Sequence, residues 1–202
     1  YEITTRLVGS EMCIRDRSYI RSMQKCGVGT SLKHFAGNNQ ETHRMTSNSM
    51  IDERALHEIY LAAFEQAVKR ARPATVMAGY NYLNGVPACE NRELLTGILR
   101  DRWGYEGLVM SDWGACVDLP ACIRAGMNVE MPDSNGNHFK DLSNAIKTGK
   151  LPVSKLAEAA QRIKELEETY GRGQRIGKRL NCVVPETRCR NHELAEKIEE
   201  ES

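Results

Sequence analysis

Hydrophobic and polar positions along the chain follow two periods, one typical of amphipathic helices and one typical of buried strands. The clearest helical stretch is 51–71, where apolar residues recur three and four positions apart on one face and Pro73 ends the pattern. Short apolar runs bounded by turn residues predict strands. These runs are 28–35, 74–80, 108–112 and 127–131.

Further helical patterns separate and follow the strands. They cover about 92–103, 117–124, 139–148 and 154–170. The chain before residue 28 shows no such pattern, and residues 1–17 match neither a helix nor a strand template. Glycines and basic residues over 171–190 predict a linker, and the periodic, acidic stretch 191–202 predicts the start of another helix.

Strands that alternate with amphipathic helices predict parallel βαβ units and therefore an α/β fold. An eight-stranded β/α barrel typically needs about 250 residues. Residues 28–170 therefore form either roughly half of such a barrel or a small, open, doubly wound sheet. The pattern alone leaves both architectures open.

Composition narrows the class of protein and of partner. The chain has 202 residues, 41% of them hydrophobic, which is typical of a globular domain, and its formal net charge of +1 gives no overall attraction to nucleic acid or to anionic membranes. No apolar run approaches the roughly 18 residues of a membrane span. No secretory signal pattern is present, so a cytoplasmic location is expected.

The cysteines favour free thiols over cross-links or metal ligands. There are seven of them, an odd number, and none forms a Cys-x-x-Cys pair. This pattern argues against a disulfide framework and against a zinc ribbon. We expect no metal site.

Polar residues follow the predicted strands, where ligand sites lie in parallel α/β folds. Lys33 and His34 end the first strand, Tyr80 the second, and Asp112 and Trp113 the third. A carboxylate, a cation, an imidazole and aromatic rings at one edge of a sheet suit a polyhydroxylated ligand, through charge-assisted hydrogen bonds and ring stacking. The sequence therefore indicates a sugar site.

Asp112 directly follows an apolar run, so a strand end holds it in place. A rigidly placed carboxylate can attack an anomeric carbon and form a glycosyl ester. The alternative is that Asp112 is the N-cap of the next helix. The other candidates also have plain alternatives: Lys33 and His34 as a polar strand edge, Arg44 as a solvated charge, and Met77 and Tyr80 as core residues.

Three segments together resemble the family 3 glycoside hydrolases, chiefly β-glucosidases. They are Lys33–Arg44 (KHFAGNNQETHR), Val76–Asn81 (VMAGYN) and Ser111–Gly114 (SDWG), and the similarity extends over about 18–170. The resemblance implies the C-terminal half of a (β/α)8 barrel, followed after a linker by the start of an α/β sandwich domain. Residues 1–17 fit neither this family nor a helix or strand template, and 8–17 resemble translated sequencing-adapter text, so we expect residues 1–17 not to be native to the protein.

The resemblance assigns a role to each candidate. Asp112 matches the nucleophile of a retaining hydrolysis of terminal β-D-glucosyl residues, which requires no cofactor. Lys33, His34 and Arg44 match residues that bind sugar hydroxyls. Met77, Tyr80 and Trp113 match residues that line the same pocket.

The acid/base carboxylate of this family comes from sequence beyond the barrel, so we assign that role to no residue here. Asp118, Glu130 and Asp133 have no support as candidates. The expected partners are a β-glucoside or oligosaccharide and the remainder of the polypeptide. Two other functions stay open: a non-catalytic sugar-binding relative, and anion or nucleic-acid binding through the basic segment 171–190.

Overall fold

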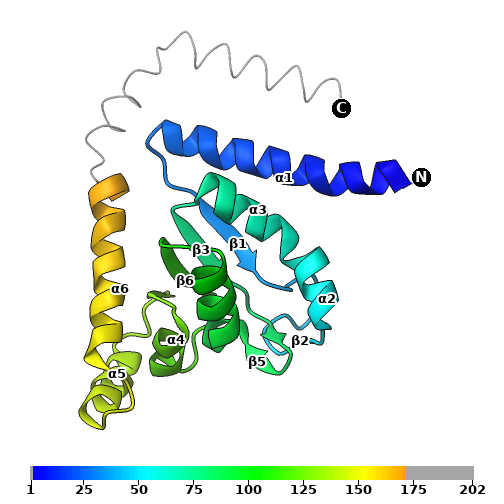
Figure 1. The fold of residues 1–202 in the computed structure, drawn as a ribbon. Helices are drawn as coiled ribbons and strands as arrows, with labels where there is room; N and C mark the ends of the chain where they lie inside the picture. The colour runs from blue at the N-terminus through cyan, green and yellow to red at the C-terminus, as the bar shows by residue number, and fades with distance from the viewer. Residues whose placement is uncertain (1, 172–202) are drawn as a thin grey trace, which may run out of the picture.

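A computed structural model describes residues 2–171, with side chains from residue 14 onward. Its main sheet contains β1 (Ser31–Phe35), β3 (Thr75–Ala78), β6 (Leu108–Trp113) and β7 (Val129–Met131). The strands are parallel and lie in the order β1-β3-β6-β7, so neighbours along the chain are neighbours in the sheet (Figure 1). This confirms the four predicted strands, and the order is that of consecutive barrel strands.

Helices follow the strands as the pattern predicted. The predicted helix 51–71 is present as three consecutive segments, α2 (Glu53–Ala55), η1 (Leu56–Tyr60) and α3 (Ala62–Ala71), of which η1 is a π-helical turn. The remaining helices that follow strands are η3 (Glu93–Arg102), α4 (Leu119–Ala125), α5 (Asn137–Lys147) and α6 (Val153–Leu166), which continues into η4 (Glu167–Gly171). The predicted linker and final helix beyond residue 171 lie outside the described residues.

The start of the chain differs from the expectation of no regular structure. Residues Glu2–Lys25 form helix α1, which lies along α3 in Figure 1. Ile20 is buried against Ala67 and Ala71, and the side-chain oxygen of Gln24 accepts a hydrogen bond from the Ala74 backbone at 2.8 Å. The sequence pattern misses α1 because tertiary contacts at its C-terminal end, rather than a periodic apolar face, hold it.

A second, small sheet joins residues that the pattern assigned to loops. It consists of β2 (Asn48–Ser49), β4 (Tyr82–Leu83) and β5 (Val86–Pro87), and the short helix η2 (Ala88–Glu90) follows it. Asn84 turns the β4–β5 hairpin with a positive φ of 50°, and its amide exchanges two hydrogen bonds with the backbone of Ile51. Strands of two residues are too short to show a period of two.

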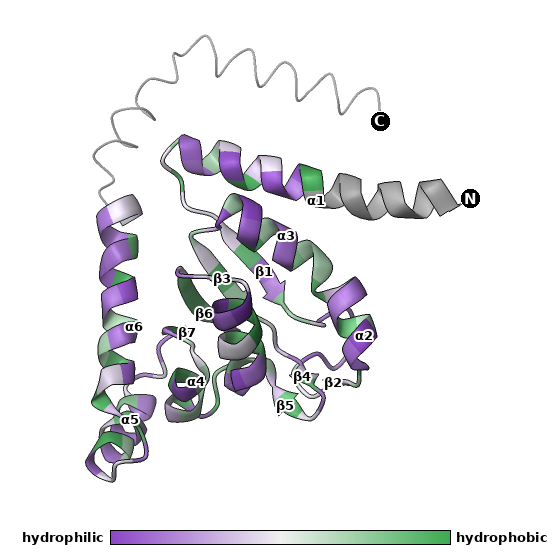
Figure 2. Cartoon of the chain, in the orientation of Figure 1, coloured by the Kyte–Doolittle hydropathy of each residue, from purple (hydrophilic) through white to green (hydrophobic). Residues whose placement is uncertain are grey.

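The core lies between the main sheet and its helices. Phe35 of β1 is fully buried and meets Phe64 and Trp103 edge to face, with ring centroids 5.1 and 5.8 Å away. Apolar residues gather on β6 and on the helix faces turned to the sheet, whereas α6 carries many hydrophilic residues (Figure 2). Among the described residues, no helix has the length and apolar character that a membrane crossing needs.

A half-buried arginine connects η3 to the segments that precede two strands. Arg100 donates to the carbonyls of Tyr105, Gly107 and Gly126 and to the side-chain oxygen of Asn128, at 2.9–3.2 Å. Burial lowers the pKa of Arg100 to about 10, so the guanidinium keeps its charge at neutral pH. The same Asn128 oxygen accepts from Val109 N of β6 at 2.8 Å, which ties β6 to the start of β7.

Two isoleucines on helical segments provide a matched test of this core. Ile98 of η3 is 3% exposed, whereas Ile59 of η1 is 68% exposed. We expect Ile98→Ala to lower the free energy of unfolding by about 2–5 kcal/mol, because it removes buried methyl groups and leaves a cavity. Ile59→Ala should change it by less than about 0.5 kcal/mol. Urea denaturation followed by circular dichroism measures both, and equal effects would contradict the assigned core.

Candidate active site

The carboxyl ends of β1, β3 and β6 bring three polar segments to one edge of the sheet. Near the end of β1, His34 Nε2 lies 3.2 Å from Asp112 Oδ2 of β6. The two strands flank β3, and Gly79 directly follows β3 between them. A side chain at Gly79 would meet Asn81 Oδ1 at 2.7 Å and Asn38 Cβ at 3.3 Å, so a glycine here lets these groups converge.

Asp112 is a buried carboxylate with one free oxygen. Its residue is only 4% exposed, and Oδ1 accepts a hydrogen bond from the backbone N–H of Trp113 at 2.7 Å. Within the described part of the chain, Oδ2 accepts no hydrogen bond, although His34 lies close by. A buried acceptor without a donor is costly, so this oxygen is well placed to accept from, or attack, a ligand.

The capping alternative for Asp112 is wrong. Helix α4 is capped by Asp118, whose side chain accepts from Ala121 N at 2.9 Å. Asp112 lies within β6 instead, and its nearest backbone donor is the following residue. Position on a strand end, rather than helix capping, therefore accounts for this aspartate.

Three side-chain oxygens at this edge of the sheet are buried without a hydrogen-bond donor among the described residues. Asn38 Oδ1, Asn81 Oδ1 and Asp112 Oδ2 are buried, and none of them accepts a hydrogen bond from the described residues. The amide nitrogen of Asn81 donates to Ala36 O and Tyr82 O, at 3.2 and 3.1 Å, which fixes its side chain. Each of these oxygens can accept a hydrogen bond from a hydroxyl group.

Arg44 and Tyr80 form a second, connected group. The Arg44 guanidinium carbon lies 4.3 Å from the centre of the Tyr80 ring, and Glu41 accepts from Arg44 at 2.7 Å. Tyr80 donates its hydroxyl to Trp113 O at 2.9 Å. Burial raises the pKa of Tyr80, and the negative charge of Asp112 raises it further, so the phenol stays protonated at neutral pH. The hydrogen bond that Arg44 donates to Glu41 raises the pKa of Arg44.

The remaining candidates occupy different places. Trp113 follows Asp112 with 58% of its surface exposed, so its ring is free to stack on a ligand. Met77 lies on β3 beside Met110 and is 9% exposed. Lys33 lies on edge strand β1, exposed, and lines a hollow beside α1 together with Tyr19. The structure thus brings His34, Arg44, Tyr80, Asp112 and Trp113 together and places Lys33 at the edge.

Sequence reasoning missed Glu41 and Asn38 as site residues. Glu41 orients Arg44, and Asn38 Nδ2 also donates to Glu41 Oε1 at 3.3 Å. Both lie in the polar loop after β1, a stretch in which several polar side chains follow one another. That composition predicts a loop, but it does not reveal which of its side chains contact Arg44 or one another.

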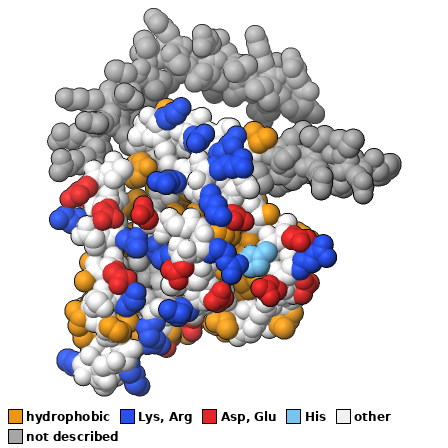
Figure 3. Space-filling model, viewed as in Figure 1, with side chains coloured by type: hydrophobic (Ala, Val, Ile, Leu, Met, Phe, Trp, Pro, Cys, Tyr) orange, Lys and Arg blue, Asp and Glu red, His pale blue; other side chains and the backbone are white. Residues whose placement is uncertain are grey.

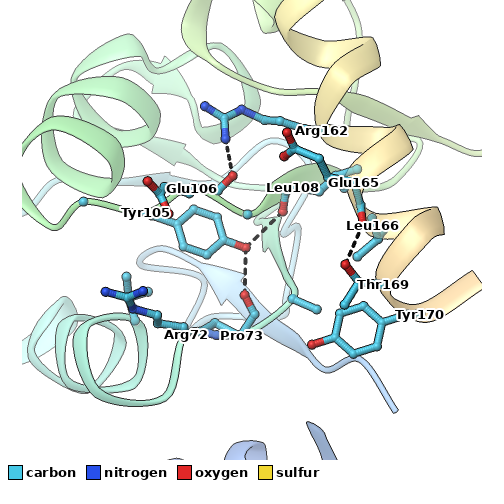
Figure 4. A pocket seen from close by; sticks show the side chains of 14 residues that line it. Arg72, Pro73, Tyr105, Glu106, Leu108, Arg162, Glu165, Leu166, Thr169 and Tyr170 are labelled. Carbon is cyan, nitrogen blue, oxygen red and sulfur yellow. Dashed lines mark hydrogen bonds between the residues drawn. The ribbon is translucent and has the colours of Figure 1, made fainter. Parts of the chain in front are cut away.

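Another hollow lies at the opposite end of the strands. It is lined by residues that precede β3 and β6, among them Pro73 and Tyr105, and by Arg162 and Tyr170 (Figure 4). Tyr105 donates to the carbonyls of Pro73 and Leu108, both at 3.2 Å, and Arg162 donates to Glu106 O. Barrel enzymes hold their chemistry at the carboxyl ends of the strands, so these contacts are read as structural.

The two tryptophans report on this arrangement. Trp103 is buried beneath Phe35, whereas Trp113 is exposed at the site. We expect iodide or acrylamide to quench one fluorescence component strongly and the other weakly. Trp113→Phe should remove the quenched component and Trp103→Phe the protected one. Equal quenching of both single-tryptophan variants would contradict the site as described.

Comparison with known proteins matches the part of the chain that contains this site. Residues 14–166 match the Glycosyl hydrolase family 3 N terminal domain. The thermostable beta-glucosidase B of Acetivibrio thermocellus is 51% identical over 146 residues, which are 72% of this chain and 19% of that protein. An exo-alpha-(1->6)-L-arabinopyranosidase of Bifidobacterium breve is 49% identical over 142 residues, 70% of this chain and 18% of that protein.

A solved structure gives the same result for the fold. The beta-glucosidase 3B of Thermotoga neapolitana in complex with glucose superposes with a TM-score of 0.72 and 40% identity, over 74% of this chain and 22% of that one. The chain therefore spans about a fifth of the length of the relatives it matches. By sequence and by fold, the chain belongs to glycosyl hydrolase family 3, and its described residues form part of the (β/α)8 barrel of that family's N-terminal domain.

Proposed function

We propose that this chain supplies the nucleophile and much of the sugar-binding surface of a retaining glycosidase that cleaves terminal β-D-glucosyl residues. The observation that carries the proposal is the buried Asp112 carboxylate, whose Oδ2 lacks a hydrogen bond from the described residues and lies 3.2 Å from His34. Membership of the family and the similarity to named beta-glucosidases support the same reaction. Because the chain covers a fifth of those relatives, the activity belongs to a longer protein.

The chemistry follows from the positions of the side chains. Asp112 Oδ2 attacks the anomeric carbon, and the negative charge of Asp112 stabilises the oxocarbenium-like transition state before the ester forms. The hydrogen bond from Trp113 N holds the other oxygen, so the attacking oxygen keeps one orientation. Trp113 then offers an exposed ring beside the reacting carbon for stacking on the sugar.

The rest of the site holds the sugar hydroxyls. His34, which lies 3.2 Å from the Asp112 carboxylate, and Arg44, which packs on the Tyr80 ring, are the proposed donors, and the free oxygens of Asn38 and Asn81 are the proposed acceptors. Contacts to hydroxyls that strengthen as the ring distorts lower the barrier rather than merely the binding constant. Lys33 and Met77 are proposed to join this surface in the longer protein.

The acid/base group is proposed to come from outside residues 1–202. A retaining mechanism needs a second carboxyl group about 5–5.5 Å from the nucleophile. Of the acidic residues near the strand ends, Asp118 caps α4 and Glu130 is hydrogen-bonded to His138 at 2.5 Å. Both carboxyl groups already have hydrogen-bond partners, so neither is assigned the role.

The choice of sugar rests on the relatives and on the residues together. The names of the relatives include both a beta-glucosidase and an arabinopyranosidase. We favour glucosides, because a glucose complex is known for a protein of the same fold at 40% identity. A non-catalytic sugar-binding role is the alternative, and the retention of Asp112 in a buried, free state argues against it.

Binding of nucleic acid has less support. Acidic and basic side chains are mixed over the face shown in Figure 3, and the formal net charge is +1. The basic segment 171–190 lies beyond the described residues except for Gly171. A nucleic-acid surface needs a concentrated basic patch, which this distribution does not provide.

Replacing the nucleophile tests the proposal directly. In a chimera, the matching segment of the Acetivibrio thermocellus beta-glucosidase is exchanged for residues 14–166 of this chain. We expect the unmodified chimera to hydrolyse a nitrophenyl β-glucoside. Asp112→Asn should lower kcat by roughly 10³-fold or more while glucose binding persists, because it removes the covalent step and few ground-state contacts.

Asp118→Asn is the matched control for this experiment. Asparagine also caps helices, so this variant should keep its turnover within about threefold. If Asp112→Asn retains turnover, or if an Asp112→Asn chimera that is folded loses glucose binding as severely as turnover, the nucleophile assignment fails. An inactive unmodified chimera that still binds glucose would favour the non-catalytic alternative.

His34 is expected to contribute through the transition state. His34→Ala in the same chimera should lower kcat/KM by roughly 10- to 1,000-fold, because the donor next to Asp112 is lost. His43→Ala serves as the control, since His43 lies in the loop that follows β1 and its side chain is exposed. Unchanged kinetics for His34→Ala would show that this histidine has only a structural role.

A further inference from the structure

A second cluster of reactive side chains lies beside the candidate active site. Cys116 lies in the loop between β6 and α4, Glu130 lies on β7, and His138 lies in the first turn of α5. One sulfur, one carboxylate oxygen and one imidazole nitrogen of these residues lie within 4.8 Å of one another. Cys116 is buried, and the Glu130 and His138 side chains are largely buried, with 15% and 20% exposure.

We propose that Cys116, Glu130 and His138 form a binding site for a divalent cation of the zinc type, with a fourth position open to water. Thiolate, imidazole and carboxylate are the ligands that Zn²⁺ takes in proteins, at about 2.0–2.3 Å. Three protein ligands with one open position is the arrangement of exchangeable zinc sites rather than of closed structural ones. The site shares no residue with the proposed sugar site, so it does not depend on the proposed glycosidase activity.

The geometry needs only local adjustment. Ligand atoms around a tetrahedral Zn²⁺ lie about 3.3–3.8 Å apart, as bond lengths of about 2.0–2.3 Å require. Glu130 Oε2 and His138 Nδ1 are 2.5 Å apart and hydrogen-bonded, so the cation would replace the proton that they share. The sulfur has to approach from within 4.8 Å, a displacement that a cysteine side chain achieves by rotation.

Neighbouring groups hold two of the ligands in place. Ser134 Oγ donates to Glu130 Oε1 at 3.4 Å and accepts from the backbone N–H of His138 at 3.0 Å, which joins the end of β7 to the start of α5. Such outer contacts orient metal ligands and contribute to affinity. The plain alternative is that Glu130 and His138 form a structural hydrogen-bonded pair with Cys116 merely packed nearby.

A neighbouring thiol is suited to support a Cys116 thiolate. Cys116 donates to Cys122 across 3.6 Å in the described structure. Metal binding requires the Cys116 thiol to release its proton to solvent. Cys122, fully buried on α4, can then turn its S–H toward the thiolate.

A cation here would restrain the loop that follows Trp113. Gly114 N donates to Met131 O at 2.7 Å, so the loop already touches the end of β7. A bond from the metal to Cys116 would add a second tie between this loop and the β7–α5 turn. Occupancy of the site would therefore stabilise the fold around Asp112 by linkage.

Cobalt spectroscopy tests the site on the 202-residue chain. Cys13, Cys26, Cys182 and Cys189 are first replaced by serine, which leaves only Cys89, Cys116 and Cys122. Titration with Co²⁺ should then give one equivalent of a thiolate-to-cobalt charge-transfer band, which Zn²⁺ abolishes by displacement. The midpoint of thermal unfolding should rise with added Zn²⁺.

Three variants and one control complete the experiment, each checked by far-ultraviolet circular dichroism. Cys116→Ala should remove the charge-transfer band, and Glu130→Gln and His138→Gln, which keep hydrogen-bonding side chains, should weaken Co²⁺ binding at least about tenfold. Cys89→Ala should bind Co²⁺ like its parent. Absence of the band in the parent chain, or its persistence in Cys116→Ala, would overturn the proposal in favour of the hydrogen-bonded pair.

Discussion

Parallel pairing of β1, β3 and β6 is the constraint on which the candidate site depends. Each pairing is in register at its start, Ser31 with Thr75 and Thr75 with Leu108, so the strands reach the same edge of the sheet together. His34 and Asp112 are 78 positions apart in the sequence. Their side chains nevertheless lie 3.2 Å apart, because only β3 lies between their strands in the sheet. A slip of one residue in β6 would turn Asp112 to the opposite face.

Burial of Asp112 places a functional demand on the fold. A buried, incompletely bonded carboxylate destabilises the folded state, and other interactions have to offset it. Phe35 makes its aromatic contacts from β1, and Val109 of β6 donates to the Asn128 oxygen that also accepts from Arg100. Both strands that carry His34 and Asp112 are thus supported by packing or hydrogen bonds. The packing under the site holds the Asp112 carboxylate in one orientation, which the proposed role as a nucleophile requires.

The edges of the sheet show how the segment relates to a larger barrel. Within the described residues, β1 and β7 each pair on one side only. Open edges of parallel strands offer unpaired backbone groups to further strands. Lys33 lies on such an edge, so its surroundings in a complete barrel would include residues that this chain does not contain.

The sequence by itself determined the main strands, the helices that follow them and the family, and it is the source of the proposal that Asp112 is the reacting carboxylate. The periodic apolar pattern predicted the four strands and the helices between them, and the ordered motifs around His34 and Asp112 indicated a sugar hydrolase, because a strand end in an α/β fold is a ligand position. Local patterns missed α1 and the small sheet at Asn84, since tertiary contacts rather than local period hold these elements.

Only the tertiary structure decided which side chains meet. It separated Lys33 from His34, although they are adjacent in the sequence, and it assigned the cap of α4 to Asp118 rather than Asp112. It also brought Cys116, Glu130 and His138 together, at spacings that match no metal-binding motif. Side-chain proximity across strands depends on register and packing, which no short stretch of sequence encodes.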